Sequence, residues 1–330
     1  MNFIQGDQVA IFCFVRALKT NDLGNLAFRH ALHREGHIIS TTGTIDPATK
    51  TADHHSHLAE YLWFYRSVFP RGDQFERFGL YARGLIESGD RRNVESIAMS
   101  AGDQTGDKSA LAQALQHFIS QSPWESGKLQ AAYRKFLAKR LPSPQALWVV
   151  HDGIFPKKGR HSVGVQRQFV PSLGRKMNCQ LAVVIGRIDA GGYHPLAARL
   201  CLPRHWLLAQ AKKAEKMIPE EHREPATKFE IALRLLDELR AEQPEAPDIV
   251  AEEEYFHSTD FMNGIARRKL SVRDSSEPVA TDAQRRFDRL RFELGLDHFE
   301  GRTWTGWHHH VSLVFVAHGF LASESQTKAA

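Results

Sequence analysis

Apolar residues recur at helical spacing in the first half of the chain, between Leu58 and Arg140. Leu111, Leu115 and Phe118 show this spacing, which places them on one face of a helix. Glycines and prolines divide the pattern into five segments. The predicted helices span residues 58–68, 75–86, 94–100, 108–120 and 127–137. We therefore predict a small all-helical domain here.

The hydrophobic period changes after Pro142 and Pro144. Apolar or alternating runs predict a three-strand meander at 146–151, 162–170 and 179–188, with a further candidate strand at 195–202. The remaining predicted elements are a helix at 226–241, strands at 248–251 and 270–272, and helices at 258–268, from the N-cap Thr281 to 296, and at 307–321. This order predicts an α/β fold: an RNase H-like mixed sheet flanked by helices and preceded by the helical domain.

Three segments follow from these patterns: an N-terminal extension at 1–57 without assigned elements, a helical and candidate DNA-binding domain at 58–142, and an RNase H-like domain at 143–325. The extension ends in a cluster of Asp53, His54, His55 and His57. Adjacent histidines rarely provide a tetrahedral metal site without a distant fourth ligand. We therefore interpret this cluster as a surface loop.

The composition is that of an ordinary globular protein: of the 330 residues, 42% are hydrophobic and 25% are charged. Its longest apolar runs, at 9–15 and 311–317, are far shorter than the roughly 20 residues of a membrane span. The N-terminus lacks the basic region and cleavage site of a signal peptide. The three cysteines have no paired spacing, which argues against a disulfide framework or a cysteine zinc site. We expect a cytoplasmic protein without a membrane partner.

The formal net charge of +5 is unevenly distributed. Residues 151–213 contain eleven Lys or Arg and two acids, a balance of +9, so the rest of the chain sums to −4. Concentrated positive charge is typical of a surface that binds a polyanion such as DNA. It is equally typical of a solvated basic surface on an enzyme without a polymer ligand.

Acidic residues occupy three positions that matter in an RNase H-like sheet. Asp152 ends the first strand, Glu252 begins an acidic run after the fourth, and Glu293 lies on a late helix. Two-metal phosphoryl transfer needs hard oxygen ligands at these places, because two Mg²⁺ ions about 4 Å apart activate the attacking oxygen and stabilise the leaving one. Each acid alone is typical of a solvated surface carboxylate, so it is their placement that predicts a site.

Longer motifs carry a family resemblance. The stretches FPKKG at 155–159, SVGVQRQ at 162–168 and NCQ at 178–180 resemble the start of the catalytic domain of bacterial insertion-sequence DDE transposases. So do ELGLDHFEGR at 293–302 and GWHHH at 306–310, the latter typical of one branch of these enzymes. A weaker similarity runs through 92–98 and 115–118 to Trp124, so that the resemblance covers roughly 60–321.

The chain departs from the family pattern at the catalytic acids. His151 stands where the first Asp is expected and Gly153 where a Thr is expected, while Asp152 is one residue away and therefore on the other face of the strand. Glu252 replaces the second Asp, whereas Glu293 matches the third acid. Only about forty residues separate Glu252 from Glu293, where such transposases commonly carry a long β-rich insertion.

The resemblance implies a DNA-binding transposase relative acting in DNA recombination. On this hypothesis Asp152, Glu252 and Glu293 hold Mg²⁺ or Mn²⁺ and, with His151 beside them, form the catalytic site. The residues expected to contact DNA are Lys157, Lys158, Arg160, Arg167, Arg302 and Trp304. For Trp304 and Trp307, packing under the last helix is the competing interpretation. Related transposases generally act as dimers, so a homodimer is included among the candidate partners.

A second hypothesis is a domesticated descendant that has lost the DNA chemistry. Such a protein would act as a DNA-binding regulator or as a biosynthetic enzyme for a small molecule, reusing His151, Glu252, Glu293 and one histidine of 308–310 as an acid-base or metal set. A fold does not determine a function, so the sequence leaves both hypotheses open.

Overall fold

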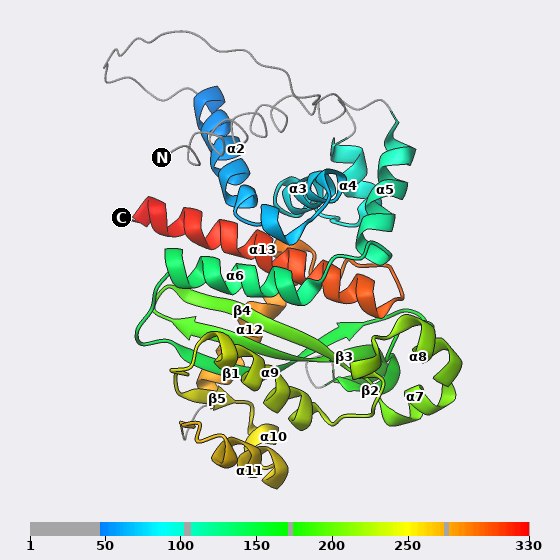
Figure 1. Ribbon diagram of the computed structural model, residues 1–330, viewed down its shortest axis with the longest axis vertical. Coiled ribbons are helices and arrows are strands. Elements are labelled where there is room, and N and C mark those ends of the chain that lie inside the picture. Colours follow the sequence, from blue (N-terminus) through cyan, green and yellow to red (C-terminus); the bar gives the residue numbers. More distant parts are fainter. Residues whose placement is uncertain (1–46, 102–106, 171–173, 274–276, 330) are drawn as a thin grey trace.

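The computed structural model describes residues 47–101, 107–170, 174–273 and 277–329, and shows a helical part stacked on a mixed sheet that has helices on both faces (Figure 1). The sheet-flanking architecture agrees with the predicted RNase H-like α/β fold. Most of the proposed N-terminal extension, residues 1–46, lies outside the described residues.

The helical part contains every helix that the periodicity predicts. Its elements are α2 (Pro47–Trp63), η1 (Arg66–Val68), α3 (Gly72–Glu87), α4 (Val94–Ala101), α5 (Lys108–Ser120) and α6 (Ser126–Arg140). The surface loop predicted around His54 to His57 is wrong, because α2 begins at Pro47 and includes these residues. Acidic partners on other helices favour the helical conformation: His57 lies 3.4 Å from Glu324, and His55 lies 3.3 Å from Glu87.

The sheet is built around two long strands, β1 (Leu147–Pro156) and β3 (Arg175–Asp189). They pair antiparallel, from Leu147 opposite Ile188 to Pro156 opposite Cys179. The other strands are β2 (Gln166–Val170) and β4 (Gly192–Cys201), both antiparallel to β3, and β5 (Ile249–Ala251), parallel to β1. The strand order β2-β3-β1-β5, with β4 also beside β3, places the ends of β1 and β5 next to each other.

The strand pairing of the predicted meander is therefore wrong, because β1 pairs with β3 and not with β2. The physical reason is burial. β1 and β3 carry nearly continuous buried runs that need cover on both faces, whereas β2 alternates with solvent and reaches only the start of β3. The predicted strand at 270–272 is reduced to one bridge between Val272 and Ile249.

Helices cover the two faces of the sheet differently. The C-terminal part contains α7 (Arg204–Ala209), α8 (Ala211–Met217), η3 (Glu220–His222), α9 (Lys228–Glu242), α10 (Glu253–Phe256), α11 (Thr259–Arg267), α12 (Glu277–Leu294) and α13 (Trp304–Ala329). One face packs against α12, α13 and α6, and the other against α9 (Figure 1). The sequence pattern did not predict α7, α8 or α10.

The start of α12 corrects another prediction. Thr281 is not its N-cap, because the helix already includes Glu277 and Pro278. A proline suits the first turn, where backbone N–H groups lack helical partners. By contrast, Ser258 does cap α11, its Oγ accepting a hydrogen bond from the Phe261 N–H.

Helix α13 joins the helical part to the sheet. Residues from Val311 to Ala317 are almost completely buried on all sides of the helix. The one polar residue among them, Ser312, accepts a hydrogen bond from the Gln130 side chain. Apolar side chains from Leu58 to Phe320 form one continuous core as a result. No helix in the described part of the chain combines the length and hydropathy that a membrane span requires.

Candidate functional site

His151 and Asp152 are neighbours near the middle of β1, so their side chains point to opposite faces of the sheet. His151 is fully buried on the α12 face, with Nε2 2.8 Å from the Tyr193 hydroxyl and its ring 5.3 Å from that of Phe287. Burial lowers the pKa of His151 to about 4, so the ring is neutral near pH 7.

Asp152 lies on the α9 face and is held by two donors. Its Oδ2 accepts a hydrogen bond of 2.7 Å from the Lys228 ammonium group at the start of α9. Its Oδ1 accepts another of 2.7 Å from the Tyr255 hydroxyl in α10. Both carboxylate oxygens therefore have partners within the chain.

Glu252 follows β5 and meets Asp152 because β5 runs parallel to β1. The Asp152 N–H donates to Glu252 Oε2 over 3.0 Å, and the Glu252 N–H donates to the Val150 carbonyl over 3.1 Å. Burial, and then the charge of Asp152, raises the pKa of Glu252 to about 8. The structure thus brings two of the three predicted acids together, with Glu252 mostly protonated near neutral pH.

The third acid has a different environment. Glu293 lies near the end of α12, where it pairs with Arg289 one turn earlier at 2.8 Å, and its side chain is 42% exposed. Within the residues that the structure describes, no three His, Cys, Asp or Glu side chains form a group that could hold a metal ion. The structure does not bring Glu293 into the pair formed by Asp152 and Glu252.

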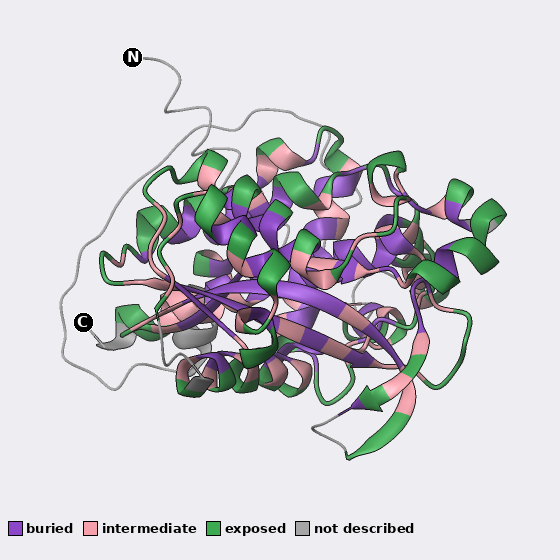
Figure 2. Cartoon of the chain, turned by 90° about the horizontal axis from the view of Figure 1, so that it is seen from below, coloured by how far each residue is buried: buried purple, intermediate pink, exposed green. Residues whose placement is uncertain are grey.

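The predicted DNA-contacting cations gather at the far end of β1. The Lys157 N–H donates to the Asn178 carbonyl over 2.8 Å, and the Val163 N–H donates to the Arg302 carbonyl over 3.0 Å. These bonds place the loop after β1, the β2–β3 hairpin and the segment before α13 side by side. In Figure 2 the hairpin projects from the body at the lower right, with the start of β3 exposed.

We call this surface the basic face and define it by six exposed cations: Lys158, Arg160, Arg167, Arg175, Lys176 and Arg302. Lys157 lies beneath it, half-buried, with Nζ donating to the Phe299 carbonyl over 3.1 Å. Burial lowers the pKa of Lys157. The nearby acid Glu300 is already engaged by Arg91 and Asn93.

Comparison with known proteins agrees with this architecture. A family model described as DDE superfamily endonuclease matches residues 65–275. The chain belongs to the DDE superfamily. It is also 29% identical over 157 residues to a protein of Microchaete diplosiphon named "Probable transposase for insertion sequence element IS701". That match covers 48% of this chain and 40% of the relative, so the chain spans less than half of the length of that transposase. No solved structure gave a significant match.

DDE superfamily endonucleases typically use divalent metal ions. Mg²⁺ and Mn²⁺ need several carboxylate oxygens directed at one point. Here Lys228 and Tyr255 occupy the oxygens of Asp152, and Glu252 accepts from the Asp152 backbone. Glu293 is paired with Arg289. In this arrangement the three acids do not fit a divalent metal centre.

Trp304 is only 5% exposed, so the predicted contact between this side chain and DNA is not supported. Its ring lies 5.0 Å from that of His222 and 4.1 Å from that of His308. The reason is that α13 begins at Trp304 and its first turn packs beneath η3. The competing interpretation, core packing, describes Trp304 and also the buried Trp307.

The histidines of the GWHHH motif form hydrogen bonds with other parts of the protein. His309 lies between the carbonyls of Ile119 and Trp124, at 3.0 and 2.8 Å, and stacks on the Trp124 ring. His310 lies 3.0 Å from the Tyr81 hydroxyl and 2.9 Å from the Gly295 carbonyl. In this structure the motif joins α13 to the helical part of this DDE protein.

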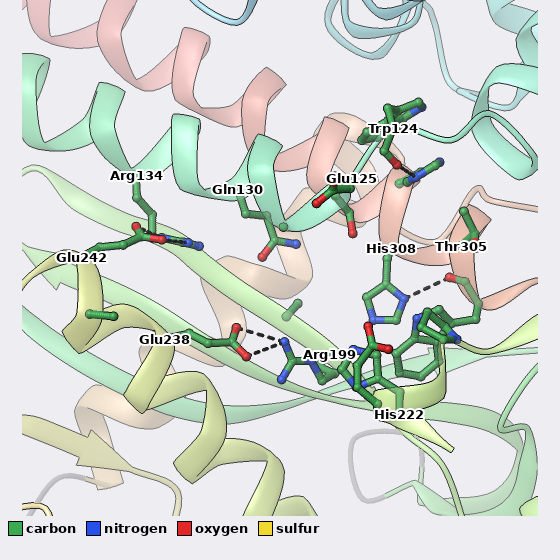
Figure 3. Close-up of a pocket in the computed structure, with 18 residues that line it drawn as sticks. Trp124, Glu125, Gln130, Arg134, Arg199, His222, Glu238, Glu242, Thr305 and His308 are labelled. Atoms are coloured by element: carbon green, nitrogen blue, oxygen red, sulfur yellow. Dashed lines mark hydrogen bonds and ion pairs between the residues drawn. The ribbon is translucent and has the colours of Figure 1, made fainter. Parts of the chain in front are cut away.

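A groove of about 550 Å³ lies between α6, β4, α9 and the start of α13 (Figure 3). Arg199 and Glu238 face each other across it with a contact of 2.8 Å, and Arg134 and Glu242 form a second pair. Of the predicted site residues Trp304 and the motif histidines His308 and His309 line this groove, but Asp152 and Glu252 do not, so it is separate from that pair of acids.

Lys228 and Tyr255 are site residues that the sequence analysis missed. Lys228 did leave a signal, because it is the first residue of α9, where a cation is opposed by the positive end of the helix dipole. A lysine at such a position indicates a nearby acidic partner that offsets this cost.

Proposed function

We propose that this DDE superfamily protein binds duplex DNA through the basic face and does not cut it by a two-metal reaction. The observation that carries the proposal is the gathering of six exposed cations on three segments that hydrogen bonds hold together. Phosphate contacts by Lys and Arg supply most of the affinity of proteins for DNA without sequence preference.

The shape of the basic face supports this assignment. On the projecting β2–β3 hairpin Arg167 and Lys176 lie on one face and Arg175 on the other, and a two-stranded ribbon of this kind fits the major groove of B-DNA. Phe169, 53% exposed on the same hairpin, is an apolar side chain free to contact a sugar or base. Within the described part of the chain, no ion pair involves the six cations that define the face.

The absence of cleavage follows from the arrangement of the acids. Lys228 forms an ion pair with Asp152, and Glu293 on α12 is paired with Arg289. This arrangement favours the domesticated, DNA-binding hypothesis over an active recombinase. A cytoplasmic location and a homodimer remain predictions.

The hairpin provides the first test. We expect the triple variant R167Q/R175Q/K176Q to bind a 30-base-pair duplex at least about tenfold more weakly at 100 mM salt, because three phosphate contacts are lost. Fluorescence anisotropy with labelled DNA measures this change.

A matched control removes the same charge elsewhere. Lys135, Lys139 and Arg140 are exposed at the end of α6, close to the opposite end of β1. We expect K135Q/K139Q/R140Q to retain near wild-type affinity. Equal losses in the two triple variants would show that net charge, and not the basic face, determines binding.

Cleavage is tested separately with supercoiled plasmid in Mg²⁺ or Mn²⁺. We expect wild type and Glu293→Ala to leave the plasmid equally intact. Nicking by wild type that Glu293→Ala abolishes would contradict the proposal and restore the active-transposase hypothesis.

A further inference from the structure

Lys228 places its ammonium group between two acidic side chains. Nζ lies 2.7 Å from Asp152 Oδ2 and 2.7 Å from Glu254 Oε2. The side chain of Lys228 is only 11% exposed and that of Asp152 15%. This contact is therefore well shielded from solvent, unlike the exposed ion pairs on the helix surfaces.

The surroundings direct the ammonium group to this position. Nζ lies 4.9 Å from the centre of the Tyr255 ring and 5.7 Å from that of Phe229, within the range of cation–π attraction. The Tyr255 hydroxyl donates to the other oxygen of Asp152, which fixes the carboxylate. A capping box between Thr227 and Glu230 fixes the start of α9 and so the backbone of Lys228.

Two acids contact this cation, and a third lies beside them. Asp152 comes from β1, and Glu252 and Glu254 come from the residues after β5. The backbone N–H of Asp152 binds Glu252 over 3.0 Å, which draws the second acid to the first. Without a cation, the Asp152 carboxylate would be shielded from solvent with only the Tyr255 hydroxyl as a side-chain partner, which is unfavourable.

We propose that the Lys228 ammonium group is a built-in counterion, occupying the place between Asp152 and Glu254, beside Glu252, that a divalent cation would otherwise take. An ammonium group has three donors and one positive charge, which suit two or three oxygens at hydrogen-bond distance. The fold of this region then needs no metal ion. The proposal is independent of DNA binding, since the basic face lies at the far end of β1.

Substitution of Lys228 tests the proposal by metal uptake. Wild type should bind no Mn²⁺ at this site, and EDTA should leave its Tm unchanged. Lys228→Ala should have a Tm lower by about 5 to 10 °C, because removal of one partner leaves a buried charge unpaired. Added Mn²⁺ should restore that Tm, with about one ion bound per chain as measured by electron paramagnetic resonance.

Controls separate the site from general effects. The exposed Lys216→Ala should behave like wild type, and Lys228→Ala combined with Asp152→Asn should not recover with Mn²⁺. Lys228→Met keeps the aliphatic stem against Tyr255 and provides a folded variant if the alanine variant fails to fold. Site-specific Mn²⁺ binding by wild type, abolished by Asp152→Asn, would overturn the proposal, as would folded Lys228 variants that take up no Mn²⁺.

Discussion

Lowering the pH from 7.5 to 5.0 should cost the protein about 5 kcal/mol of unfolding free energy, because several histidines are buried as neutral rings. Burial lowers the pKa to about 4 for His151, His309 and His310, and to about 3 for His194. An unfolded histidine titrates near pH 6.5, so between that value and the folded pKa the unfolded chain binds more protons. The stabilisation is complete above pH 6.5 and is lost as the pH falls.

Each of the four histidines contributes about 2 kcal/mol to this change. Glu252 acts in the opposite direction, because its raised folded pKa of about 8 favours the protonated form, and it returns about 3 kcal/mol over the same interval. The net sign is therefore destabilising at low pH. Urea denaturation followed by circular dichroism at pH 7.5, 6.0 and 5.0 measures it.

His309 isolates one contribution. Its two carbonyl partners favour the charged ring, whereas burial opposes it, and burial is the larger effect. We expect the stability gap between wild type and His309→Gln to shrink by about 2 kcal/mol between pH 7.5 and 5.0. A difference in stability that stays constant across this range would show that His309 does not destabilise the folded protein at acid pH.

Replacing Phe287 by alanine should destabilise the fold by about 3 to 5 kcal/mol, since a large, fully buried ring is removed. Phe287 joins α12 to β1: its ring lies 5.3 Å from that of His151 and 6.4 Å from that of Phe155. A side chain added at Gly153 would meet it at 3.1 Å, so the strand approaches the ring closely.

The same helix offers a matched control. Phe292 is 82% exposed, and Phe292→Ala should change the unfolding free energy by no more than about 0.5 kcal/mol. Urea midpoints of the two variants give the comparison. Similar losses for both would mean that α12 is packed against the sheet through a different face.

The sequence predicts most helices of the first half because their apolar residues recur over several turns. Lys108–Ser120 is reproduced to the residue, helped by an Asp107 side chain that accepts from the N–H groups of Ser109 and Ala110. Periodicity fails for the first part of α2, where polar residues and then histidines precede the apolar run that begins at Leu58. Their acidic partners, Glu87 and Glu324, are distant in the sequence.

The candidate site is predictable only in part. Strand alternation alone places His151 and Asp152 on opposite faces, and the parallel pairing of β1 with β5 brings Glu252 to Asp152. The cation between the acids could not be predicted, because Lys228 reaches them only through the packing of α9 on the sheet. The pairing of Glu293 with Arg289 is by contrast a local contact, because residues four apart on a helix are neighbours.

The central claim is that the basic face binds DNA through phosphate contacts. Its most direct test is the association constant of wild type for a 30-base-pair duplex, measured without divalent metal between 50 and 200 mM NaCl. Six contacts predict a slope of about −5 in a plot of log K against log salt. A slope near zero, or no binding at 50 mM, would contradict the account.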